Sequence, residues 1–188
     1  MGGSNRSRWR NATACRRHHQ VDGDSMNTFK TAAIILLLTL LSGCGCENGP
    51  TETIQIAGQP FVLEVASDEA AIARGMGGRD QIPPDEGMLF VFPNNLPRRF
   101  WMKDCLVDID IMFLDPLGRI TSIHMMKAEP PQDPEETQAA YEQRLTRYPT
   151  SLGAKYAIEL RASRIKDLGL EIGDKVDLPH DCLKQRLE

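Results

Sequence analysis

The residues of this sequence best suited to chemistry are two carboxylates and an imidazole that lie close together along the chain. Asp108 and Asp110 are two positions apart in an alternating segment, so their side chains would share one face of a strand. His124 falls in the next alternating segment, and pairing around the intervening turn would place it near residues 109–110. Such a group can bind a divalent metal or serve in acid–base catalysis, and Glu129 could add a ligand. This set of residues predicts a metal-assisted hydrolase.

The same residues also fit a purely structural role. Alternation in a strand often leaves acidic pairs on a solvated face, and carboxylates often accept hydrogen bonds from backbone N–H groups. A thiol–imidazole pair of Cys105 with His124 is a further option, although no G-x-S-x-G element precedes a predicted helix. We prefer the structural role, and no motif indicates a cofactor.

A second group combines basic and aromatic residues. Arg98 and Arg99 directly precede Phe100, Trp101 and Met102. These side chains could line a groove for a glycan or a peptide, with arginine meeting a carboxylate. A core position beside the apolar run MLFVF is the simpler interpretation of the tryptophan. Three isolated polar residues could also face a pocket, although nothing near them in the sequence supports this: Arg74, Tyr148 and Glu159.

Short strands must position these residues. Apolar periodicity predicts strands at 53–57, 61–65, 88–92, 109–114, 119–125 and 155–160, and a final strand after the turn at 172–176. Helix-forming segments at 68–74, 135–145 and 162–168 are short, and the tail from Pro179 shows no packing pattern. No long helix separates two strands as a parallel crossover requires. We therefore expect an α+β fold, with a compact, mostly antiparallel sheet curled into a small barrel.

The segment 26–44, MNTFKTAAIILLLTLLSGC, indicates export. Its apolar run of about ten residues is too short to span a bilayer as a helix but suits a signal peptide. It ends in Leu41-Ser42-Gly43-Cys44, which resembles the lipobox of bacterial lipoproteins, so Cys44 is the predicted lipidation site. A short anchor or a core helix is the alternative. The predicted parts are a mis-assigned or disordered extension (1–25), a signal peptide (26–43), a lipidated tether (44–52), a globular domain (53–178) and a tail (179–188).

Charge and cysteine content restrict the partners and the compartment. From Cys44 onward, 16 Lys and Arg residues oppose 24 Asp and Glu residues, a net charge of −8, which argues against a nucleic-acid partner. Outside the cytoplasm, one disulfide could form among Cys46, Cys105 and Cys182, for example between the last two. We expect the domain in the periplasm or outside the cell, tethered to the cell membrane or the outer membrane through the lipid.

Several segments resemble one known family. GMLFVFP (87–93), RRFWMKDCLVDIDIMFLDPLGRI (98–120), YAIEL (156–160) and LGLEIGDKV (168–176) are similar to the domain of unknown function 192 family, over about residues 53–178. The resemblance implies a compact, β-rich α+β fold and no established activity. Relatives commonly carry Asn-Thr at the positions of Asp104-Cys105 and R-G-L-M at 74–77, and their loop at 128–150 is shorter.

Together these observations favour a non-enzymatic, lipid-anchored envelope module. It would bind a small molecule or another envelope protein through a groove near 98–102 and the segment 128–150. The metal-assisted hydrolase remains the alternative, and whether the protein is an enzyme stays open.

Overall fold

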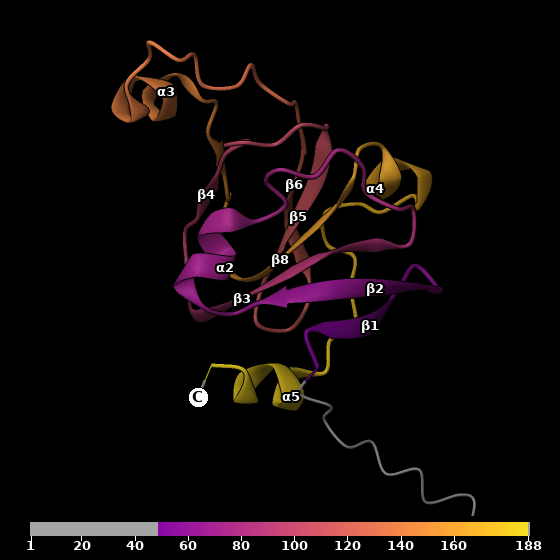
Figure 1. The fold of residues 1–188 in the computed structure, drawn as a ribbon. Helices are drawn as coiled ribbons and strands as arrows, with labels where there is room; N and C mark the ends of the chain where they lie inside the picture. Colours follow the sequence, from indigo (N-terminus) through magenta and orange to yellow (C-terminus); the bar gives the residue numbers. More distant parts are fainter. Residues whose placement is uncertain (1–48, 188) are drawn as a thin grey trace, which may run out of the picture. The chain divides into compact units, whose positions relative to one another are not determined.

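The computed structural model describes residues 49–187, so the predicted extension, signal peptide and Cys44 lie outside the described residues. Six strands form one open sheet in the order β1-β2-β3-β8-β5-β6 (Figure 1). In that order their bounds are Thr51–Ile56, Gln59–Ala66, Glu86–Leu96, Ala154–Arg161, Ile109–Leu114 and Ile120–Met126. Two short strands, β4 (Arg99–Phe100) and β7 (Tyr148–Pro149), pair with each other separately. The described helices are α2 (Glu69–Arg74), α3 (Gln138–Arg144), α4 (Arg164–Asp167) and α5 (His180–Gln185).

Both predicted hairpins are confirmed. β1 pairs antiparallel with β2 around Ala57 and Gly58, whose positive φ angles of 49° and 74° are typical of a tight two-residue hairpin turn. β5 pairs antiparallel with β6, and in the turn between them the N–H of Gly118 donates to the carbonyl of Asp115 at 3.0 Å. Local turn chemistry and alternation therefore determine these two elements.

The expectation of a small barrel is wrong, because the sheet is open; it is also mixed, with one parallel pairing beside four antiparallel ones. β2 and β3 are parallel, and the sheet ends at β1 on one side and β6 on the other. The nineteen residues between β2 and β3 contain only the short helix α2, yet they suffice to return the chain to the same end of the sheet. A parallel crossover depends on the length of the connection and does not require a long helix.

Two apolar cores lie on opposite faces of this sheet. Even-numbered residues of β5, such as Met112, face a core completed by Ile165 of α4 and Leu183 of α5. Odd-numbered residues, such as Ile111, face a core completed by α2 and by the segments 76–82 and 100–107. The central strands β5 and β8 are consequently buried on both faces, and this second core forms the floor of the site described below.

The C-terminal part differs from the expectation in two ways. Between residue 177 and the last described residue, 187, no strand forms, and an isolated bridge joins Arg119 to Lys175. The tail is packed, because α5 buries Leu183 completely and the hydroxyl of Tyr156 lies 3.0 Å from Nδ1 of His180. A short helix with few apolar residues gives a weak sequence signal, since its stability comes from tertiary packing.

Within the described part of the chain, no helix is long and apolar enough to cross a membrane.

Candidate functional site

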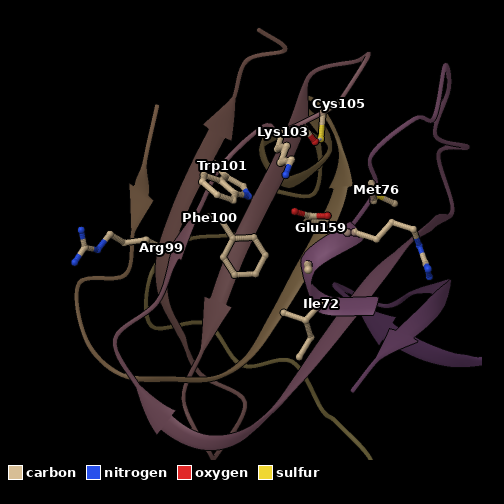
Figure 2. A pocket seen from close by; sticks show the side chains of 11 residues that line it. Ile72, Met76, Arg99, Phe100, Trp101, Lys103, Cys105 and Glu159 are labelled. Atoms are coloured by element: carbon tan, nitrogen blue, oxygen red, sulfur yellow. Dashed lines mark hydrogen bonds between the residues drawn. The ribbon is translucent and has the colours of Figure 1, made fainter. Parts of the chain in front are cut away.

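A pocket of about 260 Å³ opens between α2, the segment 99–105 and strand β8. Figure 2 shows Phe100, Trp101 and Lys103 gathered around the carboxyl group of Glu159, whereas the guanidinium of Arg99 points away. Its walls combine apolar and basic side chains around this one acid. The lining residues are Ile72, Ala73, Arg74, Gly75, Met76, Arg99, Phe100, Trp101, Lys103, Cys105 and Glu159.

Glu159 is the central group of the pocket. It lies in β8, directly opposite Ile111 of β5 and Met88 of β3, so the strand directs it into the second core. Its side chain is 4% exposed, and among the described residues Oε2 has no hydrogen-bond partner. Burial raises the pKa of Glu159 to about 8, although the nearby Arg79 and the backbone N–H of Met76 act in the opposite direction. At neutral pH this carboxyl is therefore mostly protonated and can donate a hydrogen bond.

Gly75 leaves space beside this carboxyl. It ends α2 with φ 51° and ψ −137°, a conformation that residues with a side chain rarely adopt. A Cβ at this position would lie 3.7 Å from Oε2 of Glu159 and 3.7 Å from Cζ of Phe90. The glycine thus turns the chain so that the N–H of Met76 reaches the carboxyl, while the pocket above stays open.

Aromatic rings form the opposite wall. Phe100 meets Phe90 edge to face, with ring centroids 5.0 Å apart, and also contacts Phe113 at 5.3 Å. Trp101 is partly buried, and Arg147 stacks on its ring. The core interpretation of the tryptophan is therefore incomplete, because its ring lines the pocket, whereas Met102 next to it is 1% exposed.

The thiol of Cys105 and the ammonium group of Lys103, the other two groups of the pocket that could react, are both unreactive. Burial, with added repulsion from Glu159, raises the pKa of the Cys105 thiol to about 12, and Sγ lies 3.5 Å from the carbonyl oxygen of Lys103. The ammonium of Lys103 donates to Glu142 of α3 at 2.6 Å, and this hydrogen bond raises the pKa of Lys103. A thiol with such a pKa is not a nucleophile at neutral pH.

The proposed set of Asp108, Asp110 and His124 does not come together. His124 is paired with Ile111 and shares its face, whereas Asp110 faces the opposite core. Within the part of the chain that the structure describes, no three His, Cys, Asp or Glu residues are placed to hold a metal ion. The convergence that a metal-assisted hydrolase would need is therefore not observed.

Each member of that set has a structural partner instead. Asp108 accepts from Lys127 at 2.6 Å and from the N–H of Ala128 at 2.8 Å, and these contacts lower the pKa of Asp108. Asp110 is 4% exposed and accepts from the N–H of Ile165 at 3.0 Å; desolvation raises its pKa. His124 Nε2 lies 2.8 Å from the carbonyl oxygen of Pro149.

Glu129 and the two arginines have separate environments. Glu129 accepts a hydrogen bond from the N–H of Thr146 at 2.8 Å, and this bond joins the beginning of the segment 128–150 to its end. Arg98 donates to the carbonyl of Asn94 and lies 4.3 Å from the ring centroid of Phe92. Arg99 is exposed and lines the pocket. Among the candidates named from the basic and aromatic group, Arg99 and Trp101 thus belong to the pocket and Arg98 does not.

The cysteines are distributed differently from the example pairing. Cys105 is a free, buried thiol, whereas Cys182 is disulfide-bonded. The two therefore do not pair with each other.

The fold and the pocket define a small α+β domain whose open mixed sheet supports a cavity with one buried acid. Over residues 52–178 the chain matches the model of the DUF192 family, described as Uncharacterized ACR, and it belongs to that family. The resemblance seen in the sequence and the α+β class that it implied are confirmed.

Solved structures share this fold. One is a protein of Sinorhizobium meliloti 1021 described as a candidate transcription regulator, with 28% identity, a TM-score of 0.53, and coverage of 68% of this chain and 90% of that chain. Another is a protein of unknown function from Novosphingobium aromaticivorans DSM 12444, with 23% identity, a TM-score of 0.55, and coverage of 71% and 96%. A comparison with curated proteins finds no match.

Proposed function

We propose that this protein is a non-enzymatic envelope module that binds a small ligand in the pocket above Glu159. The observation that carries the proposal is the buried carboxyl of Glu159, whose Oε2 faces a ligand-sized cavity without a partner among the described residues. A buried polar atom without a hydrogen bond costs free energy, and a ligand that supplies the partner recovers it. The aromatic and basic lining of the pocket supports a binding groove near 98–102.

The surroundings of Glu159 favour binding over catalysis. The thiol of Cys105 has a pKa of about 12, and Lys103 is engaged by Glu142, so neither offers a nucleophile or a free base. A general acid–base mechanism normally needs a second polar group poised near the first. The metal-assisted hydrolase loses its support because Asp110 and His124 lie on opposite faces of the sheet.

The envelope location rests on sequence chemistry and on one structural observation. The lipobox at 41–44 supports lipid on Cys44 as the membrane attachment. The disulfide at Cys182 fits a domain in an oxidising compartment, because disulfides persist outside the cytoplasm.

The pocket is tested by blocking it. Ala73 of α2 is exposed and lines the pocket, whereas Ala70 on the same helix is exposed and does not. We expect some members of a small-molecule panel to raise the Tm of the full-length protein and of Ala70→Trp by a few degrees, and to leave Ala73→Trp unchanged. Equal shifts in both variants, or none with any compound, would remove the proposal.

The lipid anchor has its own test. Mass spectrometry of the native protein should find an N-terminal Cys44 carrying acyl chains, and Cys44→Ala should lose both the acyl mass and the membrane association. Cys46→Ala is the matched control and should keep both. Recovery of an unmodified chain that still begins at Met1 would refute the envelope location.

A further inference from the structure

The charges around the pocket restrict the kind of ligand that it can accept. Among the residues that line it, Glu159 is the one acid, and its carboxyl group is fully buried. Two of the lining cations, Arg74 and Arg99, have no carboxylate partner among the described residues, whereas Lys103 is paired with Glu142. The opening therefore carries unpaired positive charge.

The protonated carboxyl of Glu159 adds a hydrogen-bond donor and no negative charge to this pocket. Since burial raises the pKa of its carboxyl to about 8, the group is mostly uncharged at neutral pH and presents an O–H donor. The charged and titratable groups around the pocket come from the end of α2, from the loop after it and from the segment 99–105; they are Arg74, Arg79, Arg99, Lys103, Asp104 and Cys105. Of these, Arg79 is the charged group that acts on Glu159, and the guanidinium of Arg99 points away from it. Arg79 is itself paired with Glu64 at 2.7 Å, which moderates its influence.

We infer that the pocket takes a small carboxylate with an apolar body. One oxygen of the ligand would accept the hydrogen bond from Oε2 of Glu159. Arg74 would supply the positive charge, because a guanidinium suits a carboxylate in geometry as well as in sign. The inference rests on the proposed ligand-binding role of this same pocket and names the class of ligand.

The apolar walls of the pocket restrict the size and the shape of the ligand's apolar body. Ile72 and Phe100 present apolar surface, and the ring of Trp101 closes one side (Figure 2). A volume of about 260 Å³ limits the ligand to a short aliphatic or single-ring body. Pockets of this kind bind through apolar contact and use a few polar groups to fix orientation.

The alternative ligand is a small amine, and it predicts the opposite dependence on pH. An ammonium group would favour ionised Glu159, so its affinity would rise with pH up to about 8. A carboxylate favours the protonated form, so its affinity should be constant below about pH 7 and fall about tenfold between pH 7 and pH 9.

Three compounds of similar size separate the classes: phenylacetate, phenethylamine and 2-phenylethanol. Calorimetry with the full-length protein at pH 7 and pH 9 should show phenylacetate binding at least tenfold more tightly than either analogue at pH 7. Glu159→Gln should bind phenylacetate within about threefold of the unaltered protein at pH 7, because an amide N–H can replace the acid O–H as donor. The loss of affinity at pH 9 should disappear in this variant.

Charge variants complete the test. Arg74→Gln should weaken phenylacetate binding several-fold, whereas Arg119→Gln, an exposed residue of the β5–β6 turn that does not line the pocket, should leave it unchanged. Tighter binding of phenethylamine, strengthening with pH and lost in Glu159→Gln, would overturn the carboxylate inference while preserving the binding role. Equal binding of 2-phenylethanol and phenylacetate would also overturn it. Failure of all three compounds to bind would count against both proposals.

Discussion

The guanidinium carbon of Arg147 lies 4.0 Å from the centroid of the Trp101 ring. This contact joins the segment after α3 to the wall of the pocket. Two further contacts reinforce the junction, because the hydroxyl of Tyr141 accepts from the N–H of Asp104 at 2.9 Å and Lys103 is paired with Glu142. The segment 128–150, which was expected to carry a helix at 135–145, therefore supports the wall of the pocket.

Removing this stacking should loosen the wall without unfolding the domain. We expect Arg147→Ala to lower the free energy of unfolding by about 1–2 kcal/mol, because it removes an exposed cation–π contact and the hydrogen bonds to the carbonyls of Glu142 and Leu145. Hydrogen exchange should accelerate in residues 101–105. Arg119→Ala serves as the control, since Arg119 is exposed in the β5–β6 turn and does not line the pocket. Unchanged exchange at 101–105 in Arg147→Ala would contradict the supporting role.

Glu159 should make stability depend on pH. The pKa of Glu159 is about 8 in the folded protein and near 4.5 in the unfolded chain. Below pH 4.5 Glu159 is therefore protonated in both the folded and the unfolded state, and it does not reduce the free energy of unfolding. As pH rises toward 8, the unfolded state releases a proton that the folded state retains, and the free energy of unfolding falls by up to about 5 kcal/mol. Glu159→Gln should abolish this decline in chemical denaturation at pH 5 and pH 8.

A matched acid provides the control for that measurement. Glu142 is bonded to Lys103, which lowers the pKa of Glu142, so it titrates below the range in question. Glu142→Gln should therefore leave the slope between pH 5 and pH 8 unchanged. A flat stability profile of the unaltered protein over this range would show that Glu159 titrates normally.

Cys105 should resist alkylation in the native state. Its thiol is 8% exposed, and desolvation raises its pKa to about 12, so almost no thiolate is present at pH 8. Iodoacetamide should modify the peptide 104–119 only after denaturation, as measured by mass spectrometry. Rapid native labelling at pH 8 would show that the pocket activates the thiol. The binding role without nucleophilic catalysis would then need revision.

Asp110 should contribute to the stability of the fold and not to ligand or metal binding. Its carboxylate accepts backbone N–H groups at the start of α4, from Ile165 at 3.0 Å and from Ser163. Asp110→Ala would leave these donors without their partner at a buried site, and we expect a loss of about 1–3 kcal/mol in the free energy of unfolding. Asp110→Asn keeps one acceptor oxygen and should lose less.

The same protein tests the metal alternative. Addition of Zn²⁺ or Mn²⁺ should leave the Tm unchanged, both in the unaltered protein and in Asp110→Ala. A metal-dependent rise in Tm that disappears in Asp110→Ala would restore the hydrolase hypothesis.

Sequence alone predicted the elements governed by local rules. The hairpins at 53–65 and 109–125 follow from alternation and turn residues, and α2 begins where Asp68 accepts from the N–H of Ala71 at 2.8 Å. Pairing between distant strands has no such local signal. The parallel pairing of β2 with β3 and the central place of β8 were therefore not predicted.

The candidate set around His124 failed because of a register relationship. His124 pairs with Ile111, one residue beyond the expected range of 109–110, and the bulge between Phe113 and Leu114 offsets the ladder near the turn. A difference of one residue transfers a side chain to the other face of a sheet. Alternation could place Asp108 and Asp110 on a common face, but it could not determine the partner strand's register.

Glu159 illustrates the limit for the pocket. In the sequence it is a single acid within an alternating segment, typical of a half-solvated strand. Its burial arises because α2 and the segment 99–105 approach β8 from positions more than fifty residues away. The site could have been predicted only if β8 had been recognised from the sequence as a strand buried on both faces, because an acid in such a strand is unusual.

The two ends of the described chain are fastened to each other, because Arg186 is paired with Glu52 at 2.5 Å and also donates to the carbonyl of Gly49. The first strand of the sheet is an edge strand, which could be peeled away by tension on the chain that precedes it. With Arg186 holding it, a pull at Gly49 is shared with α5, whose Leu183 is anchored in the core. Tension on the chain before Gly49 would therefore act on β1 and α5 together and not on the edge strand alone.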